Sequence, residues 1–576
     1  MLDTAIVNGT LIDGSGTPRR QADVGIRDGR VVAIGDLDES AAHTIDAADL
    51  VVTPGFVDPH THYDAQLFWD PLATPSSWHG VTSVIGGNCG FTIAPLKERD
   101  GDYIRRLMER VEGMPLAALE EGVRWTWDSF GEFLDAFEGA IAVNAGFMVG
   151  HCALRRYVME GEDTRREATD AELSAMTDLL RRSLADGGLG LSTSRSNTHM
   201  DGDGQPVPSR YASEDEVLAL CDVVGDYAGT SLEAITSGCI AGFDDDEIEL
   251  LAAMSARAGR PLNWNVLTVT SADPERFARQ LQPSVRAREM GGRVVALSMP
   301  VPAPMCMSLN TFCALWLIPG WDPILRRPVP ERAQMLRDPA VRAEMQEHAR
   351  GSALGGLARF DGYIIGDTYS AANEGLTGRK VRDIAAERGM DDTFEVLVDI
   401  VINDDFRTVL WPRDPMDIAT GNLGEDFGAY ADVWELEDVL LGGSDGGAHL
   451  DRMCGAPYVT RFLGDCVRGR QVLSLERAVQ LISDAPARLY GLRERGRLAE
   501  GYHADIVVLD PATVDAGPPT LVNDLPGNSV RMLADPIGVH RVLVNGVETV
   551  VDGGPTGATA GTVLRSGRDT DTVSTR

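Results

Sequence analysis

Two histidines, His60 and His62, close a segment that is rich in β-branched residues, Val51 to Val57. Such a run predicts a buried strand, and side chains two residues apart in an extended chain point the same way, about 7 Å apart. Two imidazoles on one face of a strand end can hold a divalent metal if other strands bring further ligands. The pair alone is equally compatible with one histidine at a solvent-facing tip.

Strands alternate with helical patterns over most of the chain, at the spacing typical of βα units. The predicted strands cover residues 51–57, 80–89, 142–150, 188–193, 230–235, 261–267 and 293–297, and an eighth covers 439–445. The second ends at Cys89, the third is tipped by His151, and the eighth ends at Asp445. This rhythm predicts an α/β barrel with chemistry-bearing residues at its strand ends.

Both ends of the chain have β character, with short strands and Asp-Gly turns. Each end is too small to hold a core alone, so we expect residues 1–50 and 496–576 to pair as one composite β-sandwich. Residues 51–495 would then form the barrel. The polar tail from about Arg565 is expected to be disordered.

Residues from about 302 to 375 interrupt the βα rhythm and predict an insertion. Prolines are mixed there with Met305, Cys306, Met307, Trp316 and Trp321. Such side chains can line a substrate pocket, or they can simply pack the core of a lid or subdomain. The sequence leaves both interpretations open.

The amino-acid composition disfavours several kinds of binding partner. The 576 residues carry a formal charge of -35, which disfavours nucleic acid and anionic membranes. Eight cysteines without CxxC spacing indicate reduced thiols, and no apolar run approaches the length of about 18 residues that a membrane span needs. The first residues have no features of a signal peptide, so a cytoplasmic location is expected.

Several motifs together resemble the amidohydrolase superfamily and, more narrowly, the N-acyl-D-amino-acid deacylases, or D-aminoacylases. They cover nearly the whole chain in the expected order, apart from the insertion. The matching segments are Gly55 to His62, His79-Gly-Val-Thr with Gly87-Asn-Cys-Gly90, Asn144 to His151, Gly188 to Thr193, Gly443-Ser-Asp-Gly446, Gly496 to Gly501 and Ala504 to Val508.

The resemblance implies a (β/α)8 TIM-type barrel with a composite β-sandwich and a metal at the carboxyl ends of the barrel strands. His60 and His62 would be metal ligands. Cys89 matches a cysteine that binds or bridges metal in D-aminoacylases, and a thiolate suits zinc. Asp445 matches the aspartate of strand eight that contacts the metal and activates water.

The chain departs from the family pattern at strands five and six, which usually end in histidines. Glu233 and Asn265 stand there, and no histidine lies between His199 and His348. A carbamylated lysine cannot substitute, because the two lysines of the chain end no predicted barrel strand. We therefore predict one Zn2+ per subunit, held by some of His60, His62, Cys89, Glu233 and Asp445. His151 and Asn265 are candidate substrate contacts.

The resemblance implies hydrolysis of the amide bond of N-acyl amino acids, with the D configuration preferred. Asp445 would take a proton from water and pass it to the leaving amine, as general base and then acid. An arginine is expected to hold the substrate carboxylate as a bidentate pair. Arg379 is a candidate for that role, with an ordinary surface arginine as the alternative.

Two other functions remain open. One is hydrolysis of another small linear or cyclic amide on the same scaffold. The other is a catalytically silent scaffold, motivated by Glu233 and Asn265 in place of histidines. A deaminase is disfavoured, because that chemistry depends on a histidine at strand five. The expected partner is a small-molecule amide, and the sequence leaves a homo-oligomer open.

Overall fold

Parallel strands at the centre of the molecule form the predicted (β/α)8 barrel. The computed structural model describes residues 1–160, 164–267, 274–352, 354–412 and 427–575. The barrel strands are β8 (Phe56–Asp58), β9 (Val81–Gly86), β10 (Asn144–Phe147) with β11 (Val149–Gly150), β12 (Gly190–Arg195), β13 (Ser231–Thr236), β14 (Leu262–Trp264), β15 (Val294–Ser298) and β18 (Val439–Leu441). A parallel bridge between Thr61 and Gly446 joins the first of these strands to the last.

The barrel strands are buried along their length, as expected for a sheet covered by helices. Every residue of β9, β13 and β15 is buried. One hydrophobic cluster joins β8, β9, β15 and β18 to the helix α21 (Asp484–Leu489). Among the surrounding helices, α6 (Asp170–Ala185) and α9 (Asp245–Ala258) each begin with a capping box, which satisfies backbone N–H groups of the first turn.

The strand predicted over residues 51–57 is two strands that serve different sheets. β7 (Val51–Pro54) pairs with β19 (Ile506–Leu509), whereas β8 pairs with β9. Gly55 separates them, and a Cβ atom there would lie 2.1 Å from Thr82 Oγ1. Only glycine lets the chain approach β9 so closely, so the strand carrying His60 and His62 is anchored directly below them.

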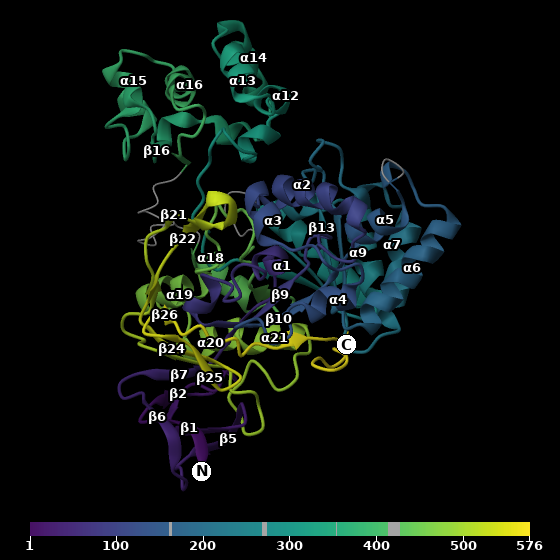
Figure 1. The fold of residues 1–576 in the computed structure, drawn as a ribbon, viewed down its shortest axis with the longest axis vertical. Helices are drawn as coiled ribbons and strands as arrows, with labels where there is room; N and C mark the ends of the chain where they lie inside the picture. The colour runs from purple at the N-terminus through teal and green to yellow at the C-terminus, as the bar shows by residue number, and fades with distance from the viewer. Residues whose placement is uncertain (161–163, 268–273, 353, 413–426, 576) are drawn as a thin grey trace. The chain divides into compact units, whose positions relative to one another are not determined.

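Strands from both ends of the chain pack face to face around one core. One sheet has the order β5-β4-β1-β6, with bounds Arg30–Gly35, Asp23–Arg27, Leu2–Val7 and Ala41–Asp46. The other, β26-β25-β24-β19-β7-β2-β3, combines β2 (Thr10–Leu11) and β3 (Arg20–Gln21) with β24 (Val539–Val544), β25 (Val547–Val551) and β26 (Gly554–Pro555). Their core includes Ile6, Val24, Val52, Ile506 and Leu543. In Figure 1 the purple amino-terminal strands lie beside the yellow carboxyl-terminal ones.

The polar tail is ordered, so the expectation of disorder from about Arg565 is wrong. β27 (Val563–Leu564) is buried and pairs in parallel with β10 of the barrel. Further along, the hydroxyl of Thr570 donates to the main-chain oxygen of Gly229 at 2.7 Å. The tail bonds through backbone, hydroxyl and charged groups, among them the guanidinium of Arg565, which composition cannot distinguish from the groups of a solvated chain.

Residues of the insertion form a second compact unit, Ala303–Leu423 with Leu450–Cys454. It extends beyond the expected end at about 375, because α15 (Val381–Glu387) and α16 (Thr393–Asn403) pack into its own core with Trp321 and Phe360. Met307, Trp316 and Trp321 are buried in that core, so they mainly pack it. A cavity of about 460 Å³ in this unit is lined in part by Trp321, Phe360 and Phe394.

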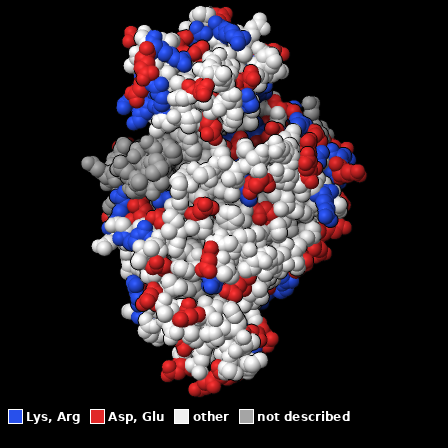
Figure 2. All heavy atoms as spheres, turned by 60° about the vertical axis from the view of Figure 1, so that its left-hand side comes forward, with Lys and Arg blue, Asp and Glu red and all other residues white. Residues whose placement is uncertain are grey.

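Charged side chains are spread over the surface. Acidic groups are scattered among wide uncharged areas on the face seen in Figure 2, as the excess of Asp and Glu leads one to expect. In the described residues, none of the helices has both the length and the apolar character that crossing a membrane requires.

Candidate metal centre

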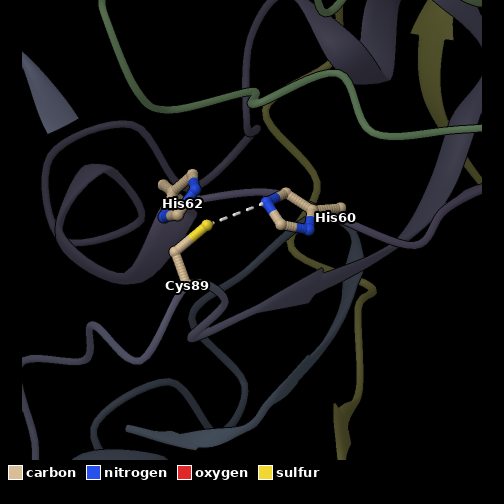
Figure 3. Close-up of side chains that lie close together, drawn as sticks. All are labelled: His60, His62 and Cys89. Carbon is tan, nitrogen blue, oxygen red and sulfur yellow. Dashed lines mark hydrogen bonds between the residues drawn. The ribbon is translucent and has the colours of Figure 1, made fainter. Parts of the chain in front are cut away.

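The barrel brings four predicted ligands together beyond the carboxyl ends of its strands. His60 and His62 follow β8, Cys89 follows β9, and Asp445 follows β18. One ligand atom from each of His60, His62 and Cys89 lies within 4.8 Å of the other two, and all three residues are buried. Figure 3 shows the sulfur of Cys89 directed at the His60 ring, with the His62 ring on its other side.

Two of the three distances between these atoms suit ligands that share one metal, and the third is slightly longer. His60 Nε2 lies 3.5 Å from Cys89 Sγ and 3.3 Å from Asp445 Oδ1, and His62 Nε2 lies 3.8 Å from the same Asp445 oxygen. Two atoms bound tetrahedrally to one zinc, at about 2.0–2.3 Å each, lie roughly 3.3–3.6 Å apart. The spacing is longer than that of strong hydrogen bonds.

Glu233 supplies a further carboxylate from inside β13. Its Oε2 atom accepts the backbone N–H of Cys89 at 2.8 Å, while Oε1 is buried and has no hydrogen-bond partner among the described residues. The Nδ1 atoms of both histidines also have no hydrogen-bond partner among the described residues. Buried polar atoms without partners are costly. The carboxylate of Glu233, together with the Cys89 thiol and the two imidazoles, fits the donor set of a divalent cation.

Burial and charge shift the pKa values of these groups in opposite directions. Burial raises the pKa of Glu233 to about 7 and that of the Cys89 thiol well above its usual value. Burial also opposes ionisation of Asp445, but the hydrogen bond and charge of His60 hold its pKa at about 2. Burial and the charge of His60 lower the pKa of His62 to about 3, so this imidazole is neutral and able to bind metal at neutral pH.

The loop that carries Cys89 is held from several sides. Asn88 donates through Nδ2 to the main-chain oxygens of Thr61 and Ile85, at 3.1 and 2.9 Å. The Ser192 hydroxyl accepts from Gly90 N–H at 3.1 Å and donates to the oxygen of Gly87. Cys89 itself has a φ of 55°, a left-handed conformation that non-glycine residues rarely adopt. These bonds keep a strained residue facing the histidines.

Glu112 is a component that sequence reasoning missed. It is the last residue of α2 (Gly101–Glu112), and its Oε2 atom lies 3.5 Å from His62 Nε2. Its side chain is 4% exposed, and burial raises the pKa of its carboxyl well above the usual value. A glutamate at the end of an amphipathic helix resembles any other surface acid in sequence. Only the position of the helix end brings it to the site.

His151 lies at the end of strand three, but its ring is already occupied. Nδ1 lies 2.9 Å from the Thr193 hydroxyl, and Nε2 lies 2.9 Å from Glu216, which also pairs with Arg155. All of these side chains are buried. Both ring nitrogens thus already have polar partners inside the barrel, and the substrate contact expected of His151 stays a prediction.

The other two candidate substrate contacts, Asn265 and Arg379, belong to different compact units of the chain. Asn265 follows β14, is 7% exposed, and its Oδ1 has no hydrogen-bond partner among the described residues. A Cβ built on Gly443 would lie 4.0 Å from the Cβ of Asn265, so Asn265 adjoins the segment that leads to Asp445. Arg379 belongs to the second compact unit, and its guanidinium pairs with Glu387 at 2.5 Å.

Comparison with known proteins identifies related enzymes. Residues 43–556 match the model of the amidohydrolase family. D-aminoacylase of Alcaligenes xylosoxydans xylosoxydans is 31% identical over 569 residues, which are 98% of this chain and 97% of that protein. The solved N-acyl-D-glutamate deacylase of Bordetella bronchiseptica, a complex with zinc and a phosphonate mimic of the tetrahedral intermediate, has a TM-score of 0.64 and 26% identity. The match covers 98% of this chain and 100% of that chain.

A second solved structure comes from work on the binuclear metal centre of D-aminoacylase, with one-metal activation and second-metal attenuation. It has a TM-score of 0.63 and 27% identity, and the match covers 98% of this chain and 100% of that chain.

Proposed function

Since the chain belongs to the amidohydrolase family and is a hydrolase of carbon–nitrogen bonds other than peptide bonds, we propose that it cleaves the amide bond of N-acyl-D-amino acids. The observation that carries this proposal is the convergence of His60, His62, Cys89 and Asp445 beyond the barrel strands. The D configuration and the N-acyl group come from the substrates named for the relatives.

The proposed cofactor is one Zn2+, held by His60, His62, Cys89 and Asp445, with Glu233 as a further ligand. Nitrogen, sulfur and carboxylate donors at these spacings support it. When bound, a divalent metal acts as a Lewis acid that polarises the scissile carbonyl and makes water more acidic. One ion is proposed because Glu233 and Asn265 occupy the places where histidines were expected at strands five and six.

Asp445 is the proposed proton carrier. Its carboxylate is ionised at neutral pH, because the hydrogen bond and charge of His60 hold its pKa at about 2 against the effect of burial. It can accept a proton from the water that attacks the carbonyl carbon. A carboxylic acid of such low pKa does not retain the proton, which passes to the leaving nitrogen as the carbon–nitrogen bond breaks. The products are a carboxylate and a free amine.

We expect Asp445→Asn to lower kcat for N-acyl-D-amino acids by at least about 100-fold, since general acid–base groups contribute about 10²–10⁴-fold. The asparagine keeps the size of the side chain but cannot carry the proton. The measurement is hydrolysis of an N-acyl-D-amino acid and of its L enantiomer, with thermal unfolding as a check of the fold. Asp246→Asn, an exposed position in α9, is the matched control. Undiminished hydrolysis by Asp445→Asn would show that Asp445 is not the proton carrier.

A further inference from the structure

Glu112 brings a third carboxylate to the candidate metal centre, and its neighbour there is the imidazole of His62. Its side chain is 4% exposed and its Oε2 atom faces His62 Nε2 at 3.5 Å. Within the ranges that the structure describes, no arginine or lysine side chain bonds to Glu112, Glu233 or Asp445. The centre therefore gathers three carboxyl groups beside the two imidazoles of His60 and His62.

The position of Glu112 is fixed by the backbone. The N–H group of His449 donates to the main-chain oxygen of Glu112 at 2.5 Å, which ties the end of α2 to the loop that follows Asp445. Gly113 then leaves the helix with a φ of 58°, a conformation that glycine adopts readily. The carboxylate is thus held at the site by its helix and not by a flexible loop.

A buried carboxylate without a partner is unfavourable unless a cation or hydrogen-bond donors compensate it. His62 Nε2 at 3.5 Å is too distant for a strong hydrogen bond. Asp445, Asp64 and Glu233 are near enough to repel the charge of Glu112 further. A metal ion next to Glu112 would favour the ionised form of its carboxyl group.

The distance between Glu112 and His62 matches the other distances in the cluster. Glu112 Oε2 lies as far from His62 Nε2, 3.5 Å, as Cys89 Sγ lies from His60 Nε2. That is the separation of two ligands on one metal ion. We infer that Glu112 is a ligand of the metal centre on the side of His62, supplied by a helix instead of a barrel strand. The inference rests on the metal dependence of the proposed function and not on its substrate.

The test compares Glu112→Gln with wild-type protein after both are freed of metal with a chelator. Zinc is titrated in competition with a chromophoric chelator, and Co2+ is titrated while its visible absorption is recorded. We expect Glu112→Gln to weaken Zn2+ binding at least tenfold and to change the Co2+ spectrum, which reports the ligand set. Glu120→Gln, an exposed glutamate of α3 (Leu116–Gly122), should behave as wild type. Wild-type Zn2+ affinity and an unchanged Co2+ spectrum in Glu112→Gln would overturn the inference.

Two further measurements separate the possible failures. Glu112→Asp keeps the charge on a shorter side chain and should bind Zn2+ more weakly than wild type; if Glu112→Gln does not fold, equal binding by Glu112→Asp overturns the inference. Hydrolysis of N-acyl-D-amino acids is measured separately. If Glu112→Gln loses metal but wild type does not hydrolyse N-acyl-D-amino acids, the proposed substrate is rejected and Glu112 remains a metal ligand. Hydrolysis by wild type together with normal metal binding in Glu112→Gln would support the proposed substrate and reject Glu112 as a metal ligand.

Discussion

Glu233 occupies the interior of β13, where one carboxylate oxygen accepts the backbone N–H of Cys89 and the other has no hydrogen-bond partner among the described residues. The residue thus does two things at once. It fixes the backbone of one proposed ligand and brings a carboxylate beside the histidines. Without a cation this arrangement is costly, because burial raises the pKa of Glu233 to about 7.

This cost makes the stability of the metal-free protein depend on pH. Between the usual pKa of 4.5 and about 7, folded Glu233 keeps a proton that the unfolded chain has lost. The folded state therefore loses stability as pH rises through this window, by on the order of 3 kcal/mol. Urea unfolding of chelated protein at pH 5 and pH 8 should give a larger loss for wild type than for Glu233→Gln. Equal losses would contradict the assigned environment.

The individual residues of the site could be predicted to different degrees. His60, His62, Cys89 and Asp445 each follow a strand, so parallel-strand topology alone directs them to one end of the barrel. Glu112 could not be found, because helical periodicity does not say where a helix ends in space.

The loop after β9 is the element that positions Cys89. Ser192, on β12, bonds to both Gly87 and Gly90 and so spans the residues on either side of the thiol. A single hydroxyl from the fourth strand thus holds a loop of the second. The Ser192 side chain is fully buried.

We expect Ser192→Ala to loosen this loop, because it leaves an N–H and a carbonyl without partners at a cost of about 1–3 kcal/mol. In metal-free protein, Cys89 should then react faster with an alkylating reagent, followed by mass spectrometry of the peptide that contains it. Ser174→Ala, on the exposed side of α6, is the control. If Cys89 reacts at the same rate in all three proteins, Ser192 does not position the loop.

Helix and strand patterns predicted the barrel well, but they did not predict which other elements each helix or strand packs against. The apolar run at residues 51–57 predicts one strand, and the division at Gly55 arises from close contact with Thr82. Likewise α15 and α16 have patterns that fit barrel helices, yet they pack into the second compact unit. Partner choice depends on contacts distant in sequence, which local periodicity does not contain.

At the scale of the whole molecule, the carboxyl-terminal part of the chain bonds back to the barrel. Asp505 lies between β7 and the barrel, where it pairs with Arg495 and accepts from Asn144 of β10 and from the backbone of Asn545. These side chains link the sandwich to the third barrel strand. The sandwich and barrel are therefore expected to unfold together. Composition could not predict this, because buried polar networks resemble surface residues in sequence.

The central claim is that the cluster of His60, His62, Cys89 and Asp445 holds a metal needed for amide hydrolysis. The most direct measurement is the metal content of protein purified without chelators, together with hydrolysis of N-acyl-D-amino acids before chelation, after it and after metal is restored. We predict one Zn2+ per chain, activity lost on chelation, and activity regained when Zn2+ is added. Protein without bound metal, and without hydrolysis that added metal restores, would contradict the account and favour a catalytically silent scaffold.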